Sequence, residues 1–316
     1  MKTLSKKFMD DLTNTDGLLH PILDRVRKDH TLLLSIRKDY VNIYYRGGNI
    51  LKLEKVGDGA YKSFFDSQYN KNGESIPDLP HNIKNQDDSK KWVVAFQSLK
   101  LVMDFYFSQK AKPEREFQQL AARENNDSTI SNESEYFIAD IEFADTELGA
   151  KFDMLGVKWL ANQRKNGSNC KAALIEMKYG DGALEGSAGI IKHLKDMTAL
   201  IEDSERYQQF LRTIESKFNQ LDQLGLLGFN RCKSETKVKF DDNDRPEVIF
   251  ILANHNPRST KLSKILNDRE IDEYVERDKF DLRFFVSSFA GYGLHSKSML
   301  KLEEFRELLK RLEDAK

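Results

Sequence analysis

The sequence has little cysteine and no long apolar run. Its two cysteines, Cys170 and Cys232, lie far apart and without CxxC spacing, which argues against a disulfide framework and a thiolate zinc site. No stretch approaches the roughly 18 consecutive apolar residues that cross a bilayer, and residues 1–16 lack the apolar core of a secretory leader. The composition therefore predicts a cytoplasmic protein without a membrane partner.

An excess of charge of one sign is also lacking. The chain of 316 residues has 50 Lys and Arg against 51 Asp and Glu, a formal net charge of −1. A polyanionic partner would therefore have to be held by local patches, because the field of the whole molecule offers little attraction. With 39% hydrophobic residues, the chain can bury one large core, or one core and a smaller appended unit.

The first part of the chain has the pattern of an antiparallel β-meander. Over residues 30–66, apolar segments of strand length alternate with Lys-Asp, Gly-Gly and Gly-Asp-Gly turn signals. A polar segment with Pro77 and Pro80 follows, which is typical of a linker or a long surface loop. We therefore expect an N-terminal meander with its linker over residues 1–88 and a second domain over residues 89–316.

The second part of the chain changes to helical spacing and then alternates between strands and helices. Helices are expected over 92–109 and 113–126, the second with Pro113 in its first turn. Strand-like runs follow over 136–145, 150–160 and 171–180, then a long amphipathic segment over 189–227. A strand, a short helix, a strand and a C-terminal helix complete the order. This order predicts an α/β (mixed α+β) fold in which a mixed central sheet is flanked by helices.

The stretch "ALIEMKYGDG" places two charges in an apolar strand. Side chains alternate across a strand, so Glu176 and Lys178 share one face. If the preceding strand pairs with it as a hairpin, Asp153 lies beside Glu176, and the two carboxylates resist joint ionisation unless a cation lies between them. Hard oxygen ligands favour Mg²⁺ or Mn²⁺, to which the carbonyl of Met177 could also bind. Lys178 could orient a water molecule or stabilise charge on a phosphate.

These residues resemble the PD-(D/E)XK nuclease superfamily, which has the restriction-endonuclease-like fold. The family pattern is a helical Glu, a strand Asp and then Glu/Asp-x-Lys, and Glu116, Asp153, Glu176 and Lys178 match it in this order. The resemblance covers roughly residues 110–255. It implies a Mg²⁺-dependent nuclease that hydrolyses phosphodiester bonds, with DNA as the expected substrate and a role in prokaryotic DNA defence or processing. Two-strand cleavage would favour a homodimer.

Some assignments within this pattern stay open. Phe152 replaces the proline that precedes the family's aspartate, and Glu114 could be the helical acid instead of Glu116. Asp140 and Glu142 could support the site, or could form the solvated side of an edge strand. Glu-x-Lys alone is a common surface pair, so Glu176 and Lys178 could form a structural ion pair without a catalytic role. The alternative function is therefore a catalytically inactive module of the same fold that binds nucleic acid or a protein partner.

Two further segments are candidates for nucleic-acid contacts. A glycine-rich loop precedes a helix with Lys192, His193 and Lys195, which could contact a phosphate backbone. For His193, a place at the rim of the active site and an ordinary position on the helix surface are equally open. In the meander, Tyr45 and Arg46 combine an aromatic ring with a basic group, as in surfaces that stack bases and follow phosphates. The competing interpretation is a hairpin with a buried aromatic face and soluble edges.

Overall fold

The computed structural model describes most of the chain. It covers residues 3–57, 59–71, 73–230, 237–254, 260–287, 294, 296 and 299–314. Cys232 lies outside these residues. Among the described residues, no helix is long and apolar enough to cross a membrane.

The contacts divide the chain into two compact units. The first comprises residues 1–123 and 219–227, and the second comprises 124–218 and 228–316. The boundary at residue 123 lies downstream of the residue-88 boundary expected from the polar segment. The reason is that α3 (Gln86–Gln109) packs on α2 (His20–Lys28) and on the strands of the first unit. The division into an N-terminal meander region, residues 1–88, and a second domain, residues 89–316, stays a prediction.

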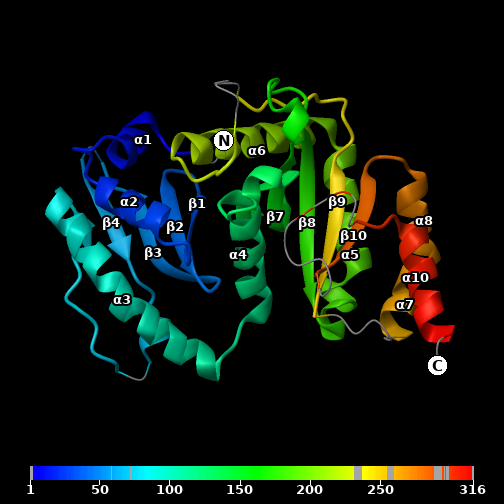
Figure 1. The fold of residues 1–316 in the computed structure, drawn as a ribbon, viewed down its shortest axis with the longest axis horizontal. Helices are drawn as coiled ribbons and strands as arrows, with labels where there is room; N and C mark the ends of the chain where they lie inside the picture. Colours follow the sequence, from blue (N-terminus) through cyan, green and yellow to red (C-terminus); the bar gives the residue numbers. More distant parts are fainter. Residues whose placement is uncertain are drawn as a thin grey trace. The chain divides into compact units, whose positions relative to one another are not determined.

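The first unit is built on an antiparallel five-stranded sheet in the order β1-β2-β3-β4-β5, and α3 lies beside it (Figure 1). The meander was expected, but β5 comes from the polar segment and pairs with β4. Trp92 of α3 donates its indole N–H to the carbonyl of Pro80 at 3.1 Å, which fixes this segment further. The strands and remaining helices of this unit are β1 (Leu32–Ile36), β2 (Tyr40–Tyr45), β3 (Gly48–Lys55), β4 (Tyr61–Phe64), β5 (Asn82–Ile83), α1 (Lys6–Thr13) and the first part of α4 (Pro113–Asn126).

The turn between β2 and β3 is tight. Arg46 and Gly47 both have positive φ, +48° and +71°, as in the two-residue turns that suit the twist of a hairpin. A Cβ atom on Gly47 would lie 2.5 Å from the backbone of Arg115, so α4 approaches this turn closely. Glycine is therefore required at position 47 for both its conformation and its small size.

The second unit contains a mixed five-stranded sheet in the order β10-β9-β8-β7-β6. β6, β7 and β8 pair antiparallel, whereas β8, β9 and β10 pair parallel, which confirms the expected mixed sheet. Seven of the nine residues in the central strand β8 are buried, because it has neighbours on both sides and layers on both faces. The strands are β6 (Tyr136–Asp145), β7 (Ala150–Lys158), β8 (Lys171–Tyr179), β9 (Glu247–Ala253) and β10 (Asp281–Val286).

Helices cover both faces of this sheet. On one face, Phe284 stacks between Phe250 of β9 and Phe305 of α10 (Leu302–Asp314), with ring centroids 5.8 and 5.3 Å apart. On the other face, Phe210 of α6 (Ser204–Gln223) packs on Phe152 of β7. The other helices are α5 (Ile190–Glu202), α7 (Thr260–Leu266) and α8 (Arg269–Glu276). The long amphipathic segment is thus two helices, α5 and α6, separated at Asp203.

Candidate active site

β7 and β8 bring Asp153 and Glu176 together. The two strands pair with Met154 opposite Ile175, so Asp153 and Glu176 occupy the next positions of the hairpin. The backbone N–H of Asp153 donates to Oε1 of Glu176 at 3.3 Å, and the N–H of Met177 donates to Oδ2 of Asp153 at 2.9 Å. The side-by-side placement of the two carboxylates that the sequence suggested is therefore present.

Lys178 joins these carboxylates on the same face of β8. Its Nζ lies 3.2 Å from Oε2 of Glu176, and the two side chains are only 4% and 1% exposed. Most lysines and glutamates remain in solvent, because burial of a charge is costly unless it is paired. The pair therefore needs an explanation, either structural or catalytic.

His193 completes the cluster from the first turns of α5. Its Nδ1 lies 3.2 Å from Oε2 of Glu176, and its side chain is 21% exposed. Burial and the nearby charge of Lys178 lower the pKa of His193 to about 4, so the imidazole is neutral at pH 7. The sequence left a place at the rim of the active site open for His193, and in the structure its side chain lies against the Glu176 carboxylate. Its contact with nucleic acid stays a prediction.

The electrostatics of Glu176 are unusual. Burial and the neighbouring Asp153 carboxylate raise its pKa well above the ordinary value, and the attraction of Lys178 opposes them only in part. A buried carboxyl group with a charged partner and a strongly shifted pKa is a frequent feature of functional sites. The cluster has access to solvent through Asp153 and His193, which are both partly exposed.

The donor set of the cluster suits a hard divalent cation. Asp153 and Glu176 provide two adjacent carboxylates, whose mutual repulsion a cation would relieve. Among the described residues, no group of three His, Cys, Asp or Glu side chains is arranged to hold a metal ion. Mg²⁺, however, usually retains several water molecules and takes only one or two carboxylates from the protein. The two carboxylates thus fit Mg²⁺ or Mn²⁺, and the carbonyl of Met177 stays a predicted third ligand.

Glu116 belongs to the other compact unit, where it has its own partner. Arg46 Nε lies 2.8 Å from Glu116 Oε1, and Arg46 Nη1 lies 2.9 Å from Asp104 Oδ1. The hydroxyl of Tyr45 donates to Asp104 at 3.0 Å. Tyr45 and Arg46, which we expected to contact nucleic acid, are therefore part of an intramolecular network with the expected helical acid.

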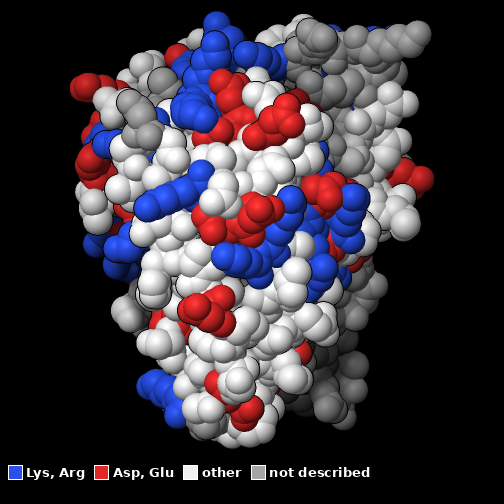
Figure 2. Space-filling model, turned by 90° about the vertical axis from the view of Figure 1, so that its left-hand side faces the viewer, with Lys and Arg blue, Asp and Glu red and all other residues white. Residues whose placement is uncertain are grey.

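The other expected surface residues show a mixture of charges. Lys192 pairs with Asp196 one turn further along α5, whereas Lys195 is exposed. Elsewhere, on the left-hand side of the view in Figure 1, Figure 2 shows Lys and Arg side chains between Asp and Glu side chains. This mixture agrees with the near-zero net charge of the chain.

Asp140 has a structural partner that the sequence analysis did not identify. Its Oδ2 lies 2.8 Å from Nζ of Lys217 in α6, and both side chains are fully buried. The suggestion that Asp140 faces solvent on an edge strand is wrong, because α6 covers it. The feature of the sequence that could have indicated this pair is Lys217 itself, a lysine at a core position of α6 between the buried residues Ile214 and Leu221.

No family model, no curated protein and no solved structure matches the chain.

Proposed function

We propose that the chain is a Mg²⁺- or Mn²⁺-dependent nuclease of the PD-(D/E)XK type that hydrolyses phosphodiester bonds, with DNA as its substrate. The observation that supports this proposal is the convergence of Asp153, Glu176 and Lys178 on one face of the β7–β8 hairpin. The mixed sheet, with the acid and Glu-x-Lys on adjacent antiparallel strands, supports the same proposal.

Each residue has a distinct part in this proposal. Asp153 and Glu176 would hold the cation, which when bound supplies Lewis-acid activation and neutralises charge on the phosphate. Lys178 orients water and stabilises negative charge that develops on the phosphate oxygens. His193 holds the Glu176 carboxylate in place through Nδ1.

A second candidate is a catalytically inactive module of the same fold. The observation in its favour is the burial of the Lys178–Glu176 pair, which would serve as a structural ion pair without any metal. Under this alternative, Mg²⁺ has no specific effect on the native protein.

Nuclease activity can be tested with a panel of linear, circular and single-stranded DNA and of RNA, in Mg²⁺ or Mn²⁺. We expect metal-dependent cleavage of DNA, and a loss in Lys178→Met of about 10²–10³-fold in turnover, as for other groups that stabilise transition-state charge. The matched control is Lys264→Ala, because Lys264 is an exposed lysine on α7 of the same unit. Equal cleavage by Lys178→Met and the wild type would contradict the proposal.

Thermal unfolding distinguishes the two candidates without a substrate. A metal that binds the native state raises the melting midpoint by mass action. We expect this rise in the wild type and its absence in Asp153→Ala. A folded wild type that neither cleaves nucleic acid nor responds to divalent metal would support the inactive module.

A further inference from the structure

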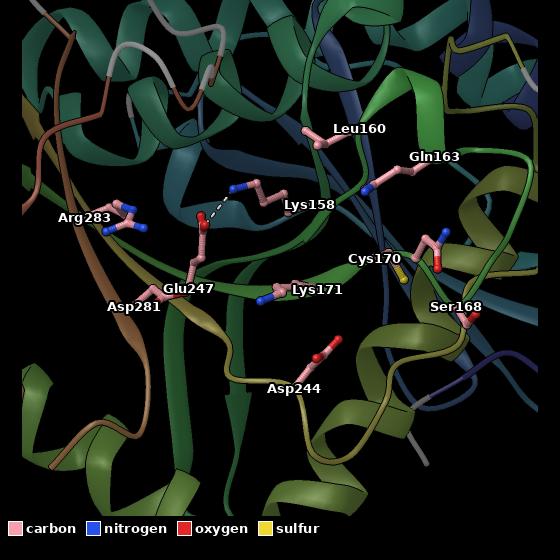
Figure 3. A pocket seen from close by; sticks show the side chains of 11 residues that line it. Lys158, Leu160, Gln163, Ser168, Cys170, Lys171, Asp244, Glu247, Asp281 and Arg283 are labelled. Carbon is pink, nitrogen blue, oxygen red and sulfur yellow. Dashed lines mark hydrogen bonds and ion pairs between the residues drawn. The ribbon is translucent and has the colours of Figure 1, made fainter.

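A second site lies in the same unit, away from the carboxylate cluster. A pocket of about 500 Å³ opens where β7 ends and where β8, β9 and β10 begin (Figure 3). Its size is that of a pocket for a small organic ligand. Lys171 and Glu176 are five positions apart on β8, and alternation along the strand places them on opposite faces. The pocket is therefore on the other face of the sheet, about 16 Å along the strand from the proposed nuclease residues.

Like charges are paired across the strands that form this pocket. Lys158 of β7 is directly opposite Lys171 of β8, and Glu247 of β9 is directly opposite Asp281 of β10. Like charges in such cross-strand positions destabilise a sheet. Two such pairs lie at one end of one sheet, so each of these four charges needs an oppositely charged partner.

Only part of this charge is neutralised within the protein. Lys158 Nζ lies 2.7 Å from Oε1 of Glu247, and the hydroxyl of Tyr136 also donates to Glu247, whose side chain is 3% exposed. Asp281 pairs with Arg245 at 3.1 Å. The acids of both like-charged strand pairs thus have cationic partners.

Lys171 and Arg283 remain as cations without an acid partner. Among the described residues, no carboxylate lies within ion-pair distance of Lys171, and the only hydrogen bond of the Arg283 side chain goes to the carbonyl of Leu282 at 3.3 Å. Both side chains are partly exposed, and in Figure 3 their charged ends point toward the same space beside the Lys158–Glu247 pair. An anion between them would balance both charges.

We propose that this pocket binds a phosphate monoester of nucleotide size. A phosphate monoester carries a charge of about −1.5 to −2 at pH 7, which matches two cations better than the single charge of a carboxylate does. The guanidinium of Arg283 offers a planar fork for two phosphate oxygens, and Lys171 adds a point charge. The pocket is larger than phosphate alone requires, and Gln163 and Asn169 provide neutral polar groups for the rest of the ligand. Asp244 also lines the pocket, so its carboxylate is expected to face the uncharged part of the ligand and not the phosphate. This proposal does not depend on the nuclease activity.

Isothermal titration tests the proposal on the whole chain. The probes are the four common nucleoside 5′-monophosphates, ribose 5-phosphate and glycerol 3-phosphate, with adenosine as the uncharged comparison. We expect at least one monoester to bind in the millimolar range or tighter and adenosine not to bind. Absence of binding by every monoester, or equal binding by adenosine and its monophosphate, would overturn the proposal.

Substitutions place the binding at this pocket. Lys171→Ala and Arg283→Met each remove one cation from the rim without emptying the core, and each should weaken binding about ten-fold or more, as expected for the loss of a charged hydrogen bond. Lys264→Ala removes the same charge elsewhere on the unit and should leave the dissociation constant unchanged. Unchanged affinity in folded Lys171→Ala and Arg283→Met would show that the ligand binds elsewhere and would reject the site.

Discussion

Asp153 and Glu176 lie side by side on β7 and β8, where the backbone N–H of Asp153 donates to Oε1 of Glu176 at 3.3 Å. The same carboxylate of Glu176 contacts Lys178 and His193 through its other oxygen, Oε2, at 3.2 Å in each case. One buried carboxylate therefore contacts two polar side chains and one backbone N–H group. A single positive charge, on Lys178, faces two carboxylates, and the Asp153 carboxylate disfavours ionisation of Glu176.

Asp153→Asn should make the protein more stable in the absence of divalent metal. The substitution removes the like charge beside Glu176 and leaves an amide oxygen that can still accept from the N–H of Met177. We expect an increase of roughly 1 kcal/mol in the free energy of unfolding, or about 2–4 °C in the melting midpoint measured in EDTA. The same variant should lose the stabilisation by Mg²⁺ and the nuclease activity.

A matched control for this prediction is Glu133→Gln, which removes an exposed carboxylate from the same unit. It should change neither the midpoint nor the response to Mg²⁺. A decrease in stability for Asp153→Asn in EDTA would mean that the two carboxylates do not repel each other in the native protein.

Glu116→Gln should reduce turnover much less than Asp153→Asn does. Glu116 already forms a pair with Arg46, and the two side chains are 42% and 36% exposed. Because exposed ion pairs contribute only about 0–1 kcal/mol, we also expect a small change in stability by chemical denaturation. Equal losses of nuclease turnover in Glu116→Gln and Asp153→Asn would instead support Glu116 as the helical acid of the site.

The sequence was sufficient to predict the features that depend on local pattern. The meander follows from alternation and turn residues, and the contact between Asp153 and Glu176 follows from one assumption, that two adjacent strands form a hairpin. The mixed character of the second sheet also followed from the order of its elements. In each case the partner of a residue is in the neighbouring strand, so short-range rules identify it.

Contacts between distant elements were not predictable in the same way. Lys217 and Asp140 are 77 positions apart, and their pairing depends on how α6 packs on the sheet. The pocket likewise combines residues that are far apart in the sequence, such as Lys171 and Arg283, which are 112 positions apart. Periodicity shows that Lys217 is at a core position of α6, but no local rule identifies its acid partner.

Lys217→Met should destabilise the protein strongly. It leaves Asp140 as a buried carboxylate without its ammonium partner, a change that typically costs about 3–5 kcal/mol. Urea denaturation of Lys217→Met, Asp140→Leu and the double variant would measure the coupling between the two side chains. We expect the double variant to recover much of the stability that Lys217→Met loses. A loss in the double variant equal to the sum of the losses in the two single variants would argue against direct pairing.

The thiol of Cys170 should be unreactive in the native protein. Burial raises its pKa to about 12, and its Sγ donates to the carbonyl of Gly167 at 3.1 Å. Since the raised pKa favours the protonated thiol, little of the group is thiolate at pH 8, and the thiolate is the form that reacts. In a Cys232→Ser background, iodoacetamide at pH 8 should therefore label Cys170 slowly in the native state and rapidly in guanidinium chloride. Labelling at the same rate in both states would show that the segment before β8 opens readily. Because Cys170 also lines the pocket, this part of the pocket would then not be rigid.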